Sequence, residues 1–300
     1  MRRNLYSIDN AMKKQVFLFS LFAIALNAFA QSDSAAFVHG PWLSERVDGL
    51  VLRRCQFEQE SLFASNQHIM VWELAVNGDF ALQFAYRPER TKTSDMAKEQ
   101  HAVAAINGSF FDMDRHFPVL FLRIDGVDFG QTTQEETKRQ SDIYRFGTLV
   151  LAHDSVFIMK TDTVPQWEAG LDYPNMMTAR PMLIFDGETM PLQEDLEFVS
   201  NRHNRTAVGI RDDGTVLLIV VDGRAPKAAG MSLQELQKVM QWLGCRDALN
   251  LDGGGSATFY ADFGGNHGVL NYPTDNGRFD HEGERTVSNA VLVVRKTKKQ

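Results

Sequence analysis

Residues 205–224 read RTAVGIRDDGTVLLIVVDGR: an apolar run, an Asp-Asp-Gly turn and a second, longer apolar run. Val and Ile favour strands, and Asp-Gly pairs favour tight turns between paired strands. Short apolar runs broken by Asp-Gly or Asn-Gly recur on both sides of this segment. The pattern predicts a strand-rich protein.

Similar signals predict further strands. Residues 68–76 and 80–88 flank an Asn-Gly-Asp sequence at 77–79, which indicates a hairpin. Asp-Gly at 125–126 separates two more apolar runs and predicts a second hairpin. The segment TVSNAVLVVRK at 286–296 is expected to form a central strand.

Clear helical patterns are fewer than strand patterns. In SLQELQKVMQWLGC, Ser232 and Glu235 form an S-x-x-E capping box, and apolar residues follow at helical spacing. Gly244 stands where a glycine would end that helix. A second helix is expected over residues 93–101.

The chain has 300 residues and contains no internal repeat, low-complexity tract or Pro-rich linker. We therefore expect one α+β catalytic domain over residues 31–300, strand-rich, with a mixed or antiparallel sheet and a few packed helices. The polar stretch at 131–142 is expected to be a mobile loop.

The N-terminal residues are typical of a secretory signal peptide. Basic residues at 13–14 precede an apolar run that ends in Ala-Phe-Ala at 28–30. Residues 1–11 are interpreted as an upstream extension of a signal peptide spanning residues 1–30. That run is short for a membrane span and no second one follows, so we expect an exported protein, periplasmic or extracellular, without a stable membrane span.

Charge and cysteine content narrow the function classes. Removing residues 1–30 deletes four basic residues and one acidic residue, which leaves 27 basic and 37 acidic groups and a formal charge of −10. Such acidity argues against nucleic acid or an anionic membrane as a partner. Cys55 and Cys245 are far apart in sequence, and two buried free thiols are favoured over a disulfide.

Three segments share one form, in which an apolar strand is followed at once by polar residues and glycine. They are AAINGSFFD at 104–112, LLIVVDGR at 217–224 and ALNLDGGGS at 248–256. Rigid scaffolds present functional groups on loops at strand ends. Three such segments, rich in Asn, Asp and Arg, predict a shared pocket.

The motifs AAINGSFFD, RTAVGI, VVDGR, GMSLQEL, ALNLDGGGSATFY, NYPTD and GERTVSNAVLV appear in that order. Together they resemble the phosphodiester glycosidase family, with the match strongest over residues 100–296. The resemblance implies hydrolysis of a sugar-1-phosphodiester at the anomeric bond, which releases the sugar and a phosphomonoester. The implied partner is a glycosyl-phosphate small molecule or glycan.

Three arginines are expected to bind the phosphate of such a substrate: Arg205, Arg224 and Arg285. The planar guanidinium group matches two phosphate oxygens at once. A salt bridge at a strand end is the competing interpretation for each of them.

Carboxylates stabilise or capture the oxocarbenium-like state of glycoside cleavage. Asp252 and Glu284 are the favoured acid/base or nucleophile pair, and Asp222 is the third candidate. The competing interpretations are an Asx-turn at Asp252, a solvated loop at Glu284 and a simple turn at Asp222.

Other residues are expected to bind or orient the substrate. Asn107 and Asn250 are short donors at strand ends, and the glycines after Asp252 are expected to let backbone N–H groups approach the anion. One of Phe110 and Phe111 is a candidate apolar platform for a sugar face, with burial in the core as the competing interpretation. Asn271 is a weaker ligand-binding candidate. The remaining members of this set are Gly253, Gly254, Gly255 and Ser256.

Alternatives stay open at this stage. No H-E-x-x-H or C-x-x-C pattern supports zinc, and no cofactor is required, but an oxygen-ligated Ca²⁺ or Mg²⁺ site remains an alternative. A metal-dependent phosphodiesterase that cleaves phosphorus–oxygen is the runner-up enzyme. A non-catalytic glycan- or envelope-binding protein is the other class.

Overall fold

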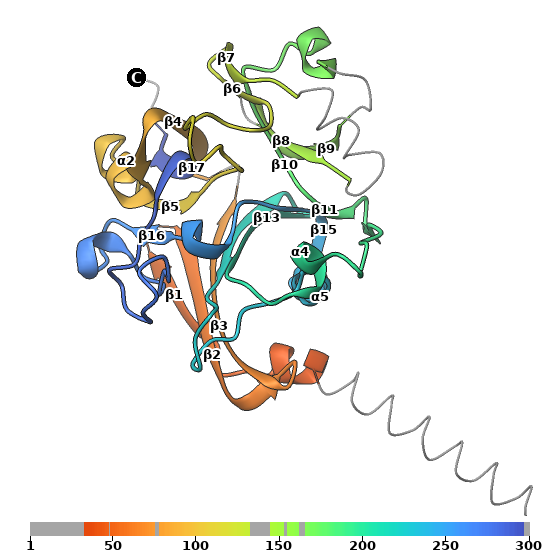
Figure 1. The fold of residues 1–300 in the computed structure, drawn as a ribbon, viewed down its shortest axis with the longest axis vertical. Helices are drawn as coiled ribbons and strands as arrows, with labels where there is room; N and C mark the ends of the chain where they lie inside the picture. Colours follow the sequence, from red (N-terminus) through yellow and green to blue (C-terminus); the bar gives the residue numbers. More distant parts are fainter. Residues whose placement is uncertain are drawn as a thin grey trace, which may run out of the picture.

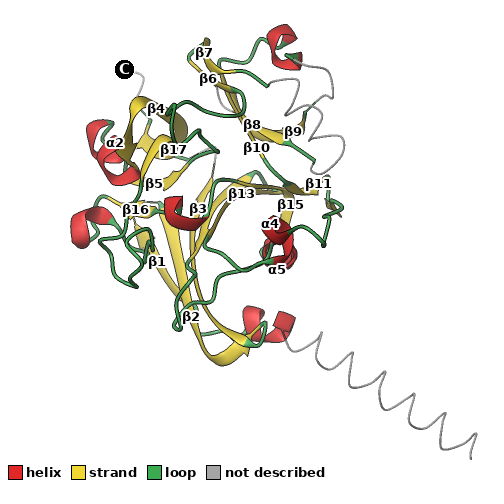
Figure 2. Ribbon diagram, in the orientation of Figure 1, coloured by secondary structure: helices red, strands yellow, loops and turns green. Residues whose placement is uncertain are grey.

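The computed structural model describes residues 33–47, 49–75, 78–132, 145–152, 155–161 and 166–296. In these residues the named strands form three sheets with antiparallel ladders, accompanied by a few short helices (Figures 1 and 2). The predicted strand-rich α+β class is confirmed. The predicted signal peptide lies outside the described residues, as does the predicted loop at 131–142 except for its first two residues.

The largest sheet has eight strands and contains the 205–224 segment at its centre. In spatial order the strands are β1 (Leu43–Val47), β2 (Leu50–Leu62), β3 (Ser65–Ala75), β14 (Thr215–Val221), β13 (Arg205–Arg211), β15 (Cys245–Asn250), β11 (Met182–Phe185) and β12 (Glu188–Thr189).

Strand β14 shows why this sheet is buried on both faces. Side chains alternate between the faces of a strand, and Leu218 and Val220 join one hydrophobic cluster while Leu217 and Ile219 join another. A continuous apolar run is the sequence expected of a strand covered on both sides.

Helix α5 (Leu233–Trp242) packs against one face of the eight-stranded sheet, and the short α4 (Glu197–Ser200) lies beside it (Figure 1). The predicted capping box is present: the Ser232 side chain accepts from the backbone N–H of Glu235, and the Glu235 carboxylate accepts from the N–H of Ser232. Gly244 follows the helix with a φ of +79°. This helix prediction is confirmed.

The other face of the large sheet packs against two smaller sheets (Figure 1). The five-stranded sheet has the order β7 (Val127–Gly130), β6 (Leu122–Ile124), β10 (Asn175–Ala179), β8 (Gly147–Ala152) and β9 (Ser155–Lys160). The four-stranded sheet has the order β16 (Phe259–Ala261), β5 (Ala104–Asn107), β17 (Thr286–Arg295) and β4 (Phe80–Lys92). The remaining elements are a helix over residues 33–38, α2 (Thr93–Glu99), and the 3-10 turns η1 (Trp167–Gly170), η2 (Gly254–Ser256) and η3 (Asn266–Gly268).

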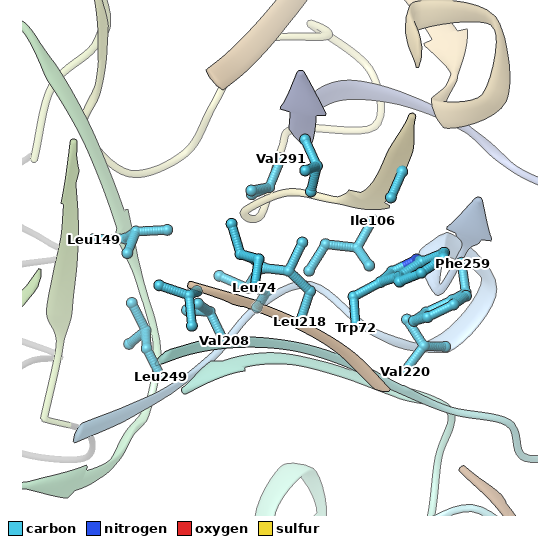
Figure 3. Packing of buried hydrophobic residues seen from close by; sticks show 14 of the residues in the cluster. Trp72, Leu74, Ile106, Leu149, Val208, Leu218, Val220, Leu249, Phe259 and Val291 are labelled. Atoms are coloured by element: carbon cyan, nitrogen blue, oxygen red, sulfur yellow. The ribbon is translucent and has the colours of Figure 1, made fainter. Parts of the chain in front are cut away.

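The main core fills the space between the three sheets (Figure 3). Trp72 of the large sheet stacks on Phe259 of the four-stranded sheet, with ring centroids 5.4 Å apart. The Trp72 indole N–H donates to the carbonyl of Tyr260 at 3.2 Å, so its polar atom is satisfied in the core. These contacts fix the four-stranded sheet on the large one.

The hairpin predicted from residues 68–76 and 80–88 is wrong. Strand β3 pairs with β2 and β14, whereas β4 pairs with β17 in a different sheet. The turn sequence does not select the pairing partner. The predicted hairpin at 125–126 is confirmed, since β6 pairs with β7, and so are helix α2 and the interior strand β17.

Cys55 and Cys245 are both free and buried, as predicted. Burial raises the pKa of each thiol to about 12. None of the helices in the described ranges has the length and apolarity needed to cross a bilayer.

Candidate active site

The register of the large sheet gathers the predicted segments at one edge. Strand β13 lies between β14 and β15 and is antiparallel to both. Arg205, the first residue of β13, is therefore opposite Val221 at the end of β14, and Ala207 is opposite Asn250 at the end of β15. The polar residues that follow β14 and β15 meet the beginning of β13.

A cavity of about 210 Å³ opens at this edge. It is lined by one carboxylate, three guanidinium groups, one imidazole, two aromatic rings and the glycine triplet. In order along the chain the lining residues are Phe110, Phe198, His203, Arg205, Arg224, Asp252, Gly253, Gly254, Gly255 and Arg285.

Asp252 supplies the carboxylate. Its backbone N–H donates to the carbonyl of Gly108 at 3.1 Å, which ties the segment after β15 to the segment after β5. Desolvation raises the pKa of the Asp252 carboxyl group to about 6, against the opposing effects of the Ser256 hydroxyl and the Arg285 charge. A carboxyl group with this pKa changes protonation state close to neutral pH, as acids and bases at catalytic sites commonly do.

Arg205 is 2% exposed, and its guanidinium group is held by backbone carbonyls alone. Nε donates to Met231 at 2.8 Å, and Nη2 donates to Phe198 and Asn201 at 3.0 and 2.8 Å. Among the described residues, Nη1 has no hydrogen-bond partner. Burial and the nearby Arg224 charge lower the pKa of Arg205 to about 10, so the group stays cationic at neutral pH.

Arg224 is exposed and has a φ of +60°, a left-handed conformation that is uncommon for a non-glycine residue. Its Nη2 lies 3.4 Å from Nδ1 of His203. Burial, with the charges of Arg205 and Arg224, lowers the pKa of His203 and favours the neutral imidazole. His203 was not a sequence candidate, although its position in the polar loop before β13 was a usable signal.

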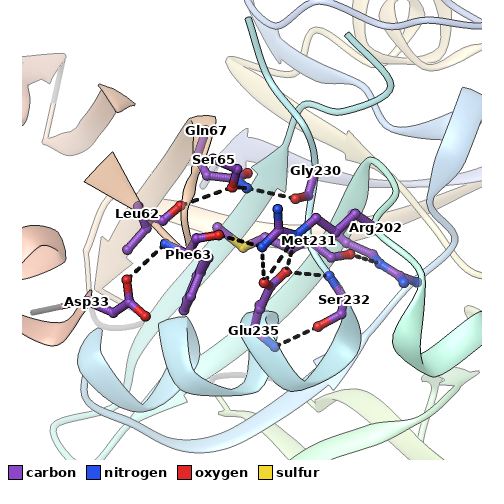
Figure 4. A network of polar contacts seen from close by, with 11 residues as sticks. Asp33, Leu62, Phe63, Ser65, Gln67, Arg202, Gly230, Met231, Ser232 and Glu235 are labelled. Atoms are coloured by element: carbon purple, nitrogen blue, oxygen red, sulfur yellow. Dashed lines mark hydrogen bonds and ion pairs between the residues drawn. The ribbon is translucent and has the colours of Figure 1, made fainter. Parts of the chain in front are cut away.

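Arg202, Met231, Ser232 and Glu235 belong to a polar network (Figure 4), and Met231 also accepts a hydrogen bond from Arg205. Arg202 Nε donates to both carboxylate oxygens of Glu235, at 3.1 and 3.0 Å. Glu235 also caps α5 through Ser232, whose neighbour Met231 accepts the hydrogen bond from Arg205. The helix cap predicted from sequence is thus connected to the cavity.

Arg285 is the only one of the three arginines whose ion pair with a carboxylate falls among the described residues: its Nε donates to Asp275 at 2.8 Å. That pair lies directly over Gly255, where an added Cβ would stand 2.5 Å from Arg285 Nη2. At Gly254, which has a φ of +59°, an added Cβ would stand 2.9 Å from Arg224 Nη2. Two of the three glycines therefore give room to phosphate-binding candidates.

The backbone N–H groups of the triplet contribute less than the sequence prediction implied. The N–H of Gly254 donates to the carbonyl of Asn204 at 2.9 Å. An added Cβ at Gly253 would stand 2.5 Å from the same carbonyl. Close packing against β13 is therefore an observed reason for glycine here.

Asn107 and Asn250 lie behind the cavity rather than in its lining. Asn107 Nδ2 donates to the carbonyl of Asp252 at 2.6 Å, and its Oδ1 accepts from the Thr206 hydroxyl at 2.7 Å. Asn250 Nδ2 donates to the carbonyl of Arg180 at 2.7 Å. Asn107 therefore holds the backbone of Asp252, and Asn250 ties the end of β15 to the segment before β11. Ser256 is fully buried and also lies outside the lining.

The structure does not bring Glu284 to the cavity. Its buried carboxylate accepts from the N–H and the hydroxyl of Ser94, at 2.8 and 2.6 Å, in the first turn of α2. Burial raises the pKa of Glu284, against the effect of these two hydrogen bonds. An acidic group in the first turn of a helix stabilises it, which is the observed role of Glu284.

Asp222 also lies outside the cavity lining, at 0% exposure. Its carboxylate contacts His68 Nδ1 at 2.7 Å and accepts from Asn271 Nδ2 at 2.9 Å. The backbone N–H of Tyr272 donates to both of its oxygens at 3.1 Å. Asp222 therefore fixes the segment that begins at Asn271.

Phe110 and Phe198 form the aromatic wall of the cavity. Their ring centroids are 6.1 Å apart in an edge-to-face arrangement. The Arg205 guanidinium lies over Phe198, 5.4 Å from its centroid, and Arg180 lies over Phe110 at the same distance. The described residues contain no group of three or more His, Cys, Asp or Glu side chains placed to hold a metal ion.

The family model described as phosphodiester glycosidase matches residues 100–294. Mouse N-acetylglucosamine-1-phosphodiester alpha-N-acetylglucosaminidase is 35% identical over 89 residues, 30% of this chain and 16% of that protein. The SPbeta prophage-derived uncharacterized protein YomE of Bacillus subtilis is 41% identical over 56 residues, 19% of this chain and 9% of that protein. The chain thus spans well under two thirds of these relatives.

Solved structures share the fold. The catalytic domain of zebrafish N-acetylglucosamine-1-phosphodiester alpha-N-acetylglucosaminidase, auto-inhibited by its pro-peptide, has a TM-score of 0.63 and 19% identity, covering 88% of this chain and 94% of that one. A hypothetical protein from Synechocystis has a TM-score of 0.59 and 15% identity, covering 85% of this chain and 64% of that one.

Proposed function

This chain belongs to the phosphodiester glycosidase family, and from that membership and the cavity we propose that it hydrolyses a sugar-1-phosphodiester. In this reaction the bond between the anomeric carbon and the phosphate oxygen breaks, and the products are the free sugar and a phosphomonoester. N-acetylglucosamine, the sugar named in the mouse and zebrafish relatives, is the first to test.

The charge balance of the cavity is the observation that carries the proposal. Arg285 is neutralised by Asp275, which leaves Arg205 and Arg224 against the single carboxylate of Asp252. A phosphodiester monoanion would bring these unpaired charges to zero. An excess of guanidinium groups suits a phosphate, whereas a divalent metal site needs an excess of carboxylates.

The arginines act on the leaving group. As the C1–O bond breaks, its electron pair goes to the phosphate, and the added negative charge spreads over oxygens near Arg205 Nη1 and Arg224. Fixed cations in a partly desolvated cavity stabilise this charge more in the transition state than in the bound substrate. Because the leaving group is a phosphate, its departure does not depend on a general acid, and a second carboxylate such as Glu284 is dispensable.

Asp252 acts on the sugar. Its ionised carboxylate stabilises or captures the positive charge that develops at the anomeric carbon. The aromatic wall of Phe110 and Phe198 would take the apolar face of the sugar ring. Water supplies the hydroxyl group at C1 and releases one proton.

We extend the proposal to location. The basic residues at 13–14 and the apolar run that follows support export, so the substrate would be met in the periplasm or outside the cell.

Hydrolysis of the methyl phosphodiester of α-N-acetylglucosamine-1-phosphate tests the proposed activity. We expect N-acetylglucosamine and methyl phosphate as products of the wild-type protein. Asp252→Asn should lower kcat by roughly 10²–10⁴-fold, while the affinity for phosphate is retained. Equal turnover by both proteins would overturn the role of Asp252, and binding without turnover by the wild type would favour a glycan-binding protein.

A further inference from the structure

A second cavity, of about 450 Å³, lies outside the proposed active site. It is lined by two aromatic rings, three amide side chains and one pair of opposite charges. The lining residues are Gln56, Glu58, Gln59, Asn66, Lys227, Tyr272 and Phe279. None of them lines the cavity that contains Asp252.

The aromatic part of this cavity belongs to a stack of three rings. Phe279 stacks on Tyr272 with centroids 4.2 Å apart and an interplanar angle of 14°. Tyr272 also stacks on His281 at 4.3 Å, and His281 Nδ1 donates to the carbonyl of Asn271 at 2.6 Å. Ring stacking and the hydrogen bond from His281 to the backbone of Asn271 together hold these three side chains in place.

Asp222, the buried carboxylate that the proposed reaction does not use, holds this stack in place. It binds the backbone N–H of Tyr272 and the side chain of Asn271. It also contacts His68, whose ring meets Tyr272 edge to face with centroids 5.4 Å apart. A network in which the buried side chains of Asp222, Asn271 and His68 are all hydrogen-bonded supports a rigid aromatic surface.

The polar side chains define what the cavity can bind. Gln56 Nε2 donates to the carbonyl of Lys227 at 2.8 Å, and Asn66 Nδ2 donates to that of Pro226 at 2.9 Å, so these amides fix the backbone at residues 226–227. Among the described residues, the side chains of Glu58, Gln59 and Lys227 form no hydrogen bond or ion pair. They offer donors and acceptors together with charges of both signs, which suits a neutral polyhydroxyl ligand better than an anion.

We propose that this cavity is a saccharide-binding subsite, in which a neutral sugar ring packs on the Tyr272–Phe279 stack while its hydroxyl groups bind Glu58, Gln59 and Lys227. The segment that carries the stack also supplies Arg285 to the first cavity. The subsite would retain the protein on a glycan chain independently of the proposed hydrolysis.

Calorimetric titration with three neutral trisaccharides, maltotriose, cellotriose and chitotriose, tests the proposal. We expect at least one to bind the full chain with a Kd below ~10 mM. Phe279→Ala should weaken that binding by ~10-fold through loss of the stacking surface, and Phe279→Tyr should restore it. Asp222→Asn should also weaken that binding, because Asp222 positions Tyr272 through its backbone N–H.

Arg224→Ala is the control, since it alters the first cavity and should leave trisaccharide binding unchanged. Turnover of the methyl phosphodiester should change less than about twofold in Phe279→Ala, so failure of this subsite and failure of the proposed reaction are separable. The proposal is overturned if no trisaccharide binds, or if Phe279→Ala binds as tightly as the wild type.

Discussion

Arg285 lies directly over Gly255, so that a Cβ on the glycine would stand 2.5 Å from the guanidinium Nη2. The ion pair of Arg285 with Asp275 fills the space that a side chain at residue 255 would need. The position of Arg285 in the cavity lining therefore requires glycine at residue 255. Replacement of Gly255 should alter the cavity more than it alters the fold.

Gly255→Ala tests this relationship. We expect the variant to lose roughly 1–3 kcal/mol of unfolding free energy through overpacking and to bind inorganic phosphate more weakly. Gly265→Ala is the matched control, because an added Cβ there meets nothing within 4 Å. Thermal unfolding and phosphate titration compare the two variants. If the two variants unfold at the same temperature and bind phosphate equally, Arg285 moves aside without cost and its close approach to Gly255 has no role.

The pH dependence of activity should follow Asp252. Its pKa is raised to about 6, and the ionised form is the one that stabilises the anomeric cation. The value of kcat/KM should therefore fall as the pH drops through about 6, well above the ordinary aspartate range. An acid limb centred near pH 4 would contradict this assignment.

The same raised pKa has a consequence for stability. Between the ordinary aspartate pKa of 3.8 and the raised pKa of about 6, the folded protein holds the Asp252 proton more tightly than the unfolded chain does. This contribution is present below that window and is lost as the pH rises through it. We expect Asp252→Asn, which carries no charge, to gain thermal stability over the wild type at pH 7.5 and to lose most of that gain at pH 4. A stability gain of Asp252→Asn that is larger at pH 4 than at pH 7.5 would contradict a raised Asp252 pKa.

Much of the fold and part of the site follow from local sequence. Asp-Gly turns, the continuous apolar run of β14 and the capping box at Ser232 are local signals, and each element they predicted is present. The false hairpin after Ala75 has the opposite cause: β3 and β4 are adjacent in sequence but enter different sheets, a tertiary choice that no turn residue encodes.

The candidate site was likewise predicted only in part from local sequence. The residues after β14 and β15 converge because β13 pairs with both strands, and strand-end motifs were enough to predict a shared pocket. Motifs do not give side-chain direction. Glu284 and Arg285 are neighbours in sequence, yet one binds Ser94 in α2 and the other lines the cavity. His203 was missed because a lone histidine carries little signal without its neighbours.

Arg224→Ala should weaken substrate binding without unfolding the protein, since the side chain is exposed. We expect the KM for the methyl phosphodiester and the inhibition constant of inorganic phosphate to rise together, by roughly 10-fold for the loss of one charge-assisted contact. Arg246→Ala removes an exposed arginine paired with Asp186 and is the matched control. Equal effects of the two variants would show that Arg224 does not contact the phosphate.

Glu284→Gln separates a structural carboxylate from a catalytic one. The change weakens two hydrogen bonds to Ser94, so we expect a loss of roughly 1–3 kcal/mol of unfolding free energy. Turnover at 25 °C should stay within a few-fold of the wild type, in contrast to Asp252→Asn. A loss of kcat similar to that of Asp252→Asn, in a folded protein, would return Glu284 to the catalytic pair.

The central claim is that the cavity of Asp252, Arg205 and Arg224 breaks the bond at the anomeric carbon. Hydrolysis of the methyl phosphodiester in ¹⁸O-labelled water, followed by mass spectrometry of both products before anomeric exchange, tests it most directly. The account predicts label on the anomeric oxygen of N-acetylglucosamine and none in methyl phosphate. Label in the phosphate would contradict it and assign phosphorus–oxygen cleavage to the site.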